Sequence, residues 1–264
     1  MKIAHEAPLS IFDRVQSLTD YDYALVHLFE ENEDYYKKFV EARDKGREII
    51  LDNSIFELGT AFDADRFAYW VEKLKPTYYI VPDVLEDSSG TIDSFDSFVE
   101  KYSDLPGKRI AVAQGKTLQD MIECYEYLAY HDKVDKPAIS FDYSFFNDAV
   151  KDMNLPNKYY EWMFGRQMLL NYMVENDIVN KDKPHHLLGC GLPQEFKDYA
   201  QYEWVDSLDT SNPVVHGIKN IKYMEHGLEN KESVKLFTMI EEDVLASWDD
   251  IVYNIGKFKE LCSA

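Results

Sequence analysis

Carboxylates recur at the ends of the short apolar segments of this chain. In the stretch WVDSLDTSNPVVH, Asp206 and Asp209 lie three residues apart, where an apolar run gives way to turn-forming residues. Asp52 and Asp83 end two other apolar segments in the same way. A carboxylate shielded from water can act as a nucleophile, as a general acid or base, or as an acceptor for N–H groups of a ligand. The sequence therefore predicts a site built from several carboxylates.

The elements that would position these side chains follow a βαβ rhythm, in which apolar, β-branched segments alternate with amphipathic ones. We expect strands over 23–28, 47–52, 78–83, 109–114, 137–141, 186–190, 204–208 and 213–218. We expect helices over 35–43, 63–74, 91–102 and 118–129. Eight strands separated by helices favour an α/β fold of the (β/α)8 TIM-barrel type over an open doubly wound sheet. The segment 147–183 is longer than a crossover needs and predicts a helical insertion.

Composition limits the classes of protein that remain. With 264 residues and 45% hydrophobic content, the chain suits one barrel domain over 1–264. No run of about 18 apolar residues and no signal peptide is recognisable, so we expect a cytoplasmic protein without membrane contact. Three widely separated cysteines suit neither a disulfide framework nor a four-thiolate metal site. His185 and His186 would point to opposite faces of a strand, so we expect neither a metal nor a cofactor.

The formal net charge of −21 at pH 7 bears on partners. Nucleic-acid binding draws much of its free energy from counterions that lysine and arginine release, and this chain repels polyanions at long range. Any contact with nucleic acid must therefore be local.

The chemistry of a parallel barrel gathers at the carboxyl ends of its strands. The residues expected there are Asp52, Asp83, Gln114, Ser140, Phe141, Asp142, Gly189, Cys190, Gly191, Asp206 and Asp209. An aspartate at such a turn can also merely cap the next helix, and that alternative stays open for each of them.

Two late segments, LLGCGLPQEF over 187–196 and WVDSLDTSNP over 204–213, resemble the queuine/archaeosine tRNA-guanine transglycosylase family. The family pairs a Leu-Met-Gly-Val-Gly-x-Pro-x-Asp segment with Val-Asp-x-Phe-Asp-x-x-x-Pro, and the spacing of both aspartates and of Pro213 is kept. The resemblance covers about 47–220 in the same order. It implies that Asp209 is the nucleophile, that Asp52, in LDNSIFE, is the acid/base aspartate, and that Asp206 orients the loop.

The same resemblance implies a base-binding set. Asp83 and Gln114 would read the edge of a guanine-like base, Phe56, His186 and Leu188 would cover its faces, and a strand end near residue 140 would supply backbone contacts. The implied set is Asp83, Gln114, Gly115, Phe56, Ser140, Phe141, His186, Leu188 and Gly189.

The chain also departs from the family pattern. The cysteine-rich zinc element is missing, so no zinc subdomain is expected, and Val214, Val215 and His216 stand where the family carries an arginine after its Pro-Thr. The sequence looks closer to the zinc-free phage and bacterial enzymes that place 7-deazaguanine bases, such as preQ0 or preQ1, in DNA. DNA is therefore favoured over tRNA as acceptor. A protein partner or a homodimer is left open as the source of the missing positive surface.

Two other functions remain open from the sequence. One is a hydrolase or deoxyribosyltransferase that acts on free nucleosides, which an acidic surface tolerates better than it tolerates a polymer. The other is a catalytically silent barrel that binds a nucleobase.

Overall fold

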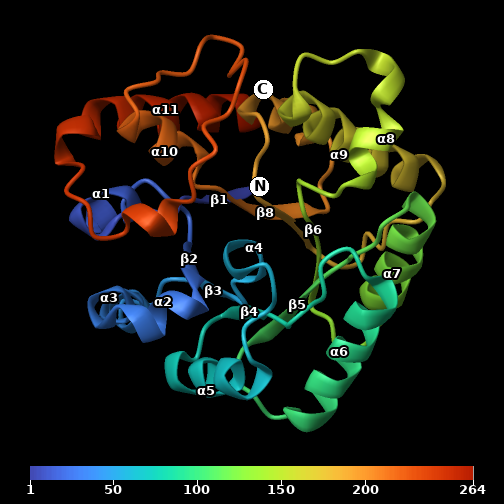
Figure 1. Cartoon of the computed structure of the whole chain (residues 1–264). Helices are drawn as coiled ribbons and strands as arrows, with labels where there is room; N and C mark the ends of the chain where they lie inside the picture. Colours follow the sequence, from blue (N-terminus) through green and yellow to red (C-terminus); the bar gives the residue numbers. More distant parts are fainter. Residues whose placement is uncertain (264) are drawn as a thin grey trace. The chain divides into compact units, whose positions relative to one another are not determined.

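The computed structural model describes residues 1–263. Its strands form one sheet in the order β1-β8-β7-β6-β5-β4-β3-β2, the pairs of determined register run parallel, and a helical segment follows each strand (Figure 1). The expected (β/α)8 TIM-barrel class is therefore confirmed. The strands are β1 (Lys2–Ala4), β2 (Asp22–Leu25), β3 (Ile49–Asp52), β4 (Tyr78–Ile80), β5 (Lys108–Val112), β6 (Lys136–Ile139), β7 (His185–Leu188) and β8 (Val205–Asp209).

Helices of very different length connect the strands. The α-helices are α1 (Phe12–Gln16), α2 (Val26–Glu31), α3 (Glu33–Asp44), α4 (Ile55–Leu58), α5 (Ala64–Leu74), α6 (Ser88–Lys101), α7 (Leu118–Tyr130), α8 (Phe145–Ala149), α9 (Lys158–Glu175), α10 (Asn212–Ile218) and α11 (Trp248–Cys262). The 3-10 turns are η1 (Leu9–Ile11), η2 (Lys151–Met153), η3 (Pro193–Tyr199), η4 (Leu236–Met239) and η5 (Leu245–Ser247). Within the described residues, no helix combines the length and apolar character needed to cross a bilayer.

The chain divides into two compact units. The first unit contains Met1–Asp20, Ser140–Val179 and the chain from Leu187 onward. The second unit contains Tyr21–Ile139 and Asn180–His186. The single domain expected over 1–264 stays a prediction.

The second unit carries the parallel strands β2 to β6, with helices α3, α5, α6 and α7 outside β2 to β5 (Figure 1). Its long helices begin at side-chain caps, since Asn32, Asp63, Asp87 and Thr117 each accept a hydrogen bond from a backbone N–H of the first turn. The four helices that the sequence predicts here are therefore confirmed. None of these caps is an aspartate of the expected site.

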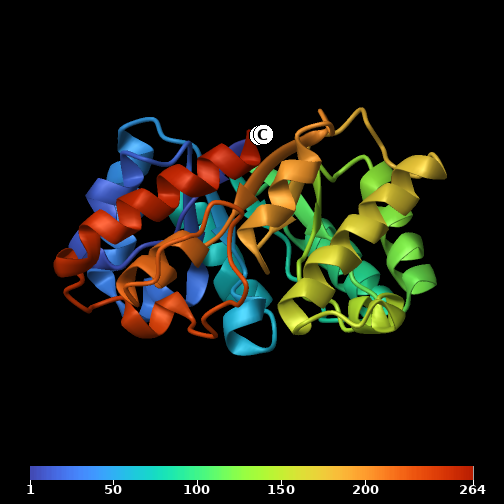
Figure 2. The same ribbon diagram turned by 90° about the horizontal axis from the view of Figure 1, so that it is seen from above.

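In the first unit, β1 pairs with β8, and helices α10 and α11 lie side by side (Figure 2). Gly217 permits this close crossing, because a Cβ at that position would lie 2.5 Å from Cγ1 and 2.7 Å from Cα of Ile251. Both helices contribute to an apolar core of Ala7, Ile11, Val15, Val214, Val215, Leu236, Val244, Ile251 and Ile255. The unit therefore has a core that the barrel pattern alone does not predict.

The expected eighth strand is wrong. Residues 213–218 lie in helix α10, with Pro213 in its first turn, where proline's fixed φ favours a helix. Val214 and Val215 are β-branched, but their packing in the α10–α11 core outweighs that propensity. The missing strand is β1, whose three residues are too few to show an alternating pattern.

The expected helical insertion over 147–183 is helical, but most of it is the regular crossover. Helix α9 starts after Asn157, whose side chain accepts from the N–H groups of Tyr159 and Tyr160, and it leads toward β7. Helix α8 and the turn η2 precede α9 in this connection.

Candidate active site

Asp83 is a buried carboxylate that two side-chain amides hold in place. It lies just beyond β4 and is 4% exposed. Asn53 donates from Nδ2 to its Oδ1 at 2.8 Å, and Gln114 donates from Nε2 to its Oδ2 at 2.7 Å. The residues that follow β3, β4 and β5 thus meet at one carboxylate.

Backbone N–H groups set the direction of the two amides. The amide oxygen of Asn53 accepts from the N–H of Ile55 at 3.0 Å, and that of Gln114 accepts from the N–H of Glu86 at 3.0 Å. With both oxygens engaged in this way, the NH2 groups must face Asp83. A carboxylate, which only accepts, is the side chain that suits this position.

The environment of Asp83 changes its acidity. Burial raises the pKa of the Asp83 carboxyl to about 6, and the hydrogen bonds from Asn53 and Gln114 partly oppose that rise. A carboxylate that only caps a helix accepts backbone N–H groups, whereas both oxygens of Asp83 accept side-chain amides. The contacts of Asp83 therefore differ from those of a carboxylate that caps a helix.

Asp52 ends β3 and is also buried, at 5% exposure. Its Oδ2 accepts from the N–H of Ser54 at 3.1 Å. Ser54 has a left-handed backbone, with φ of 61°, and its hydroxyl shares a 2.8 Å hydrogen bond with Nδ1 of His27. This unusual conformation is anchored by a buried partner and directs a backbone donor at the Asp52 carboxylate.

The other expected residues of the second unit differ in their surroundings. Gly115 packs so closely on α7 that a Cβ would lie 2.4 Å from the backbone nitrogen of Met121. Phe56, on α4, is 44% exposed. His186 is fully buried, and its ring stacks on Tyr23 with centroids 6.0 Å apart.

In the first unit, Asp209 is the last residue of β8, pairs with Ala4 of β1, and is 6% exposed. The turn after it is anchored from β1: Thr210 donates its N–H to the Ala4 carbonyl at 3.0 Å, and the Thr210 carbonyl accepts from Nδ1 of His5 at 2.9 Å. Burial lowers the pKa of His5 to about 4, which keeps this ring neutral. Asp206 is three residues earlier on the same strand, so its side chain leaves the opposite face.

The other expected residues of this unit gather after β6 and β7. Ser140 donates its hydroxyl to Asp142 at 2.9 Å, and burial raises the pKa of that carboxyl. Phe141 is buried at 5% exposure and packs on Gly189, which has a left-handed φ of 66°. Leu188 ends β7 and is half-buried.

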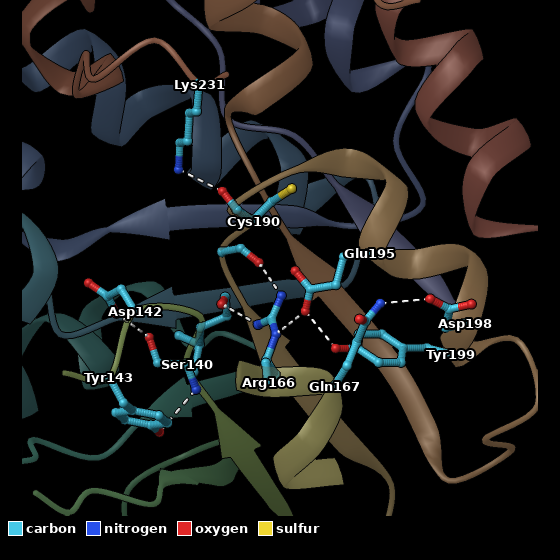
Figure 3. A network of polar contacts seen from close by, with 12 residues as sticks. Ser140, Asp142, Tyr143, Arg166, Gln167, Cys190, Glu195, Asp198, Tyr199 and Lys231 are labelled. Carbon is cyan, nitrogen blue, oxygen red and sulfur yellow. Dashed lines mark hydrogen bonds and ion pairs between the residues drawn. The ribbon is translucent and has the colours of Figure 1, made fainter. Parts of the chain in front are cut away.

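A buried cation that the sequence does not single out holds the β7 end. Arg166 is fully buried and donates to the carbonyls of Leu188 at 2.9 Å and of Gly189 at 3.1 Å (Figure 3). Its Nε pairs with Glu195 at 2.5 Å, and the Tyr199 hydroxyl donates to the same carboxylate oxygen at 2.6 Å. Arg166 lies within α9 and Glu195 within η3, 29 residues later, so no local sequence pattern links them.

Within the described residues, no group of three or more histidine, cysteine, aspartate or glutamate side chains is arranged to hold a metal ion. The residues brought together within the second unit are Asp52, Asn53, Ser54, Asp83 and Gln114. Within the first unit, Asp209 lies on β8, whereas Ser140, Phe141, Leu188 and Gly189 lie around the ends of β6 and β7.

No protein-family model matches this sequence, and no curated protein is significantly similar to it.

Proposed function

We propose that this protein is a base-exchange glycosyltransferase that replaces guanine in a nucleic acid, with DNA favoured, by a 7-deazaguanine base. The observation that carries the proposal is the Asp83 carboxylate with its two oriented amides. The resemblance of the segments around Asp52, Asp83, Gln114 and Asp209 to tRNA-guanine transglycosylases supports the same assignment.

Asp83 is the proposed reader of the base edge. Each of its oxygens accepts one amide N–H, and a carboxylate oxygen can accept two hydrogen bonds. The acceptor capacity that remains on this carboxylate would suit a ligand with two neighbouring donors, such as N1–H and the 2-amino group of guanine or 7-deazaguanine. The second N–H of Gln114 Nε2 would serve an acceptor on the same base.

Asp209 is the proposed nucleophile. One of its oxygens attacks the anomeric carbon, the glycosidic bond breaks, and the bonding electron pair leaves with guanine, which takes a proton from Asp52. The transition state resembles an oxocarbenium ion, which an adjacent carboxylate stabilises. In the second half, the incoming base returns a proton to Asp52 and attacks the same carbon, and the Asp209 carboxylate is released.

The proposal is tested by base exchange. Purified protein is incubated with a guanine-containing duplex and radiolabelled guanine or 7-deazaguanine, and label in the polymer is counted. We expect incorporation by the wild type and by Glu203→Gln, an exposed carboxylate just before β8, and a loss of at least about 1,000-fold in Asp209→Asn. Unchanged incorporation by Asp209→Asn would exclude the covalent route.

The net charge favours a second candidate function. The net charge of −21 suits a free nucleoside better than a polyanion, so a nucleoside hydrolase or deoxyribosyltransferase with the same residue roles is the alternative. Turnover of 2′-deoxyguanosine without turnover of duplex would favour it. Tight binding of a 7-deazaguanine with turnover of neither substrate would instead indicate a non-catalytic base-binding protein.

A further inference from the structure

Lys231 lies in the loop between α10 and η4 and reaches the turn after β7 (Figure 3). Its Nζ donates to the carbonyl of Cys190 at 2.6 Å and lies 4.4 Å from the centroid of the Phe141 ring. The residue is half-buried. Three successive carbonyls, at Leu188, Gly189 and Cys190, are therefore bound by two cations, Arg166 and Lys231.

Unlike Arg166, Lys231 has no carboxylate within ion-pair distance in the part of the chain that the structure describes. Burial lowers the pKa of its ammonium, although the carboxyls of Asp142 and Glu195 act in the opposite direction from farther away. A desolvated cation is costly unless it is paired. The ammonium donates one hydrogen bond, to the Cys190 carbonyl, and lies over the Phe141 ring. Two of its three N–H groups can therefore still donate to an acceptor outside the protein.

The position of this ammonium favours a phosphate. In (β/α)8 enzymes, phosphate groups frequently bind at the loops after the seventh and eighth strands. The turn after β7 touches the turn after β8 here, because Asn212, three residues beyond Asp209, donates from Nδ2 to the Gly191 carbonyl at 3.5 Å. Lysine binds phosphate as a point charge, and the attraction is stronger where water is partly excluded.

We propose that the ammonium of Lys231 binds a phosphate oxygen of the nucleotide whose base is exchanged, an inference that rests on the proposed function. It supplies the local positive contact that a chain of net charge −21 requires for a polyanionic substrate.

The test is the salt dependence of binding, measured without free base so that no exchange takes place. Fluorescence anisotropy of a labelled 20-base-pair duplex is followed across a series of NaCl concentrations for the wild type, Lys231→Met, Lys231→Arg and Lys235→Met. Lys235 is an exposed lysine of the same loop and is the matched control. Thermal unfolding establishes that each variant is folded.

We expect Lys231→Met to weaken binding several-fold at low salt and to reduce the slope of log K against log [NaCl] by about 0.9, the value for one phosphate contact. Lys231→Arg and Lys235→Met should keep the wild-type slope. An unchanged slope in Lys231→Met, or a wild type that binds neither duplex nor deoxyguanosine 5′-monophosphate, would overturn the inference.

A parallel titration with deoxyguanosine 5′-monophosphate and with 2′-deoxyguanosine separates the sources of phosphate. If Lys231→Met weakens binding of the mononucleotide only, the contact is to the phosphate of a free nucleotide, and the inference of a contact to the polymer is overturned. Failure of base exchange in the wild type with a normal slope change in Lys231→Met would reject the proposed function and leave the phosphate contact standing. Base exchange by the wild type without a slope change in Lys231→Met would support the proposed function and reject the phosphate contact.

Discussion

At the scale of single residues, the direction of two amides explains why position 83 carries an aspartate. Asn53 and Gln114 each present N–H groups to it, because their oxygens are already engaged by backbone N–H groups. An asparagine at 83 would place its own NH2 against one of these donors. Under the proposed function, the remaining acceptor capacity of this carboxylate would serve a base with paired donors.

The raised pKa of Asp83 predicts a pH-dependent contribution to stability. Because the folded-state pKa of about 6 exceeds the usual aspartate value of 3.8, the native state binds the proton more tightly. The contribution is therefore favourable at low pH and is lost as pH rises from about 4 through about 6, by on the order of 3 kcal/mol. Urea unfolding of wild type and Asp83→Asn between pH 4 and 7 should show this decline only in the wild type. Parallel curves would contradict the assignment.

At the scale of elements, the turn after β7 depends on the Arg166–Glu195 pair. Removing one partner of a buried ion pair leaves the other charge unpaired, which costs about 3–5 kcal/mol. Replacing both with apolar residues removes that penalty. The pair therefore acts as one unit, in which Glu195 holds the guanidinium that binds the carbonyls of Leu188 and Gly189.

We predict that Arg166→Met and Glu195→Leu each lower the free energy of unfolding by about 3–5 kcal/mol, and that the double variant loses much less than the sum. Urea unfolding of the four proteins measures this coupling. Additive losses would show that the two residues stabilise the turn independently.

The α10–α11 crossing allows a matched comparison of two glycines. Gly217→Ala should destabilise the protein by about 1–3 kcal/mol, because its Cβ meets the backbone of Ile251. Gly256, within α11, has nothing within 4 Å of a built Cβ. Gly256→Ala should therefore stabilise by about 0.5–1 kcal/mol through helix propensity. Equal effects of the two substitutions, measured by thermal unfolding, would contradict this packing.

At the scale of the whole molecule, the fold class follows from the alternation of apolar and amphipathic segments. Strands β2 to β8 and helices α3, α5, α6 and α7 overlap the segments where periodicity predicts them, but residues 26–28, expected in a strand, lie in helix α2. The two larger errors have physical causes: β1 is too short to show a pattern, and the valines of α10 owe their helical conformation to packing against α11. Tertiary contacts of this kind leave no local signal.

The site could be predicted only in part for the same reason. Asp52, Asp83 and Gln114 are recognisable because each ends or closely follows an apolar strand. Lys231 is 41 residues from the Cys190 carbonyl that it binds, and neither position carries a distinguishing pattern. Asn53 could have been found, since it sits beside Asp52 and has the donors that a buried carboxylate needs.

The central claim, that Asp209 bonds covalently to the sugar, is tested most directly by mass spectrometry of the protein denatured rapidly during exchange on a short guanine-containing duplex. The account predicts a protein–oligonucleotide adduct with guanine released, located by proteolysis to the peptide that contains Asp209 and absent from Asp209→Asn. Steady incorporation of labelled base with an adduct on another residue, or with the same adduct in Asp209→Asn, would contradict it.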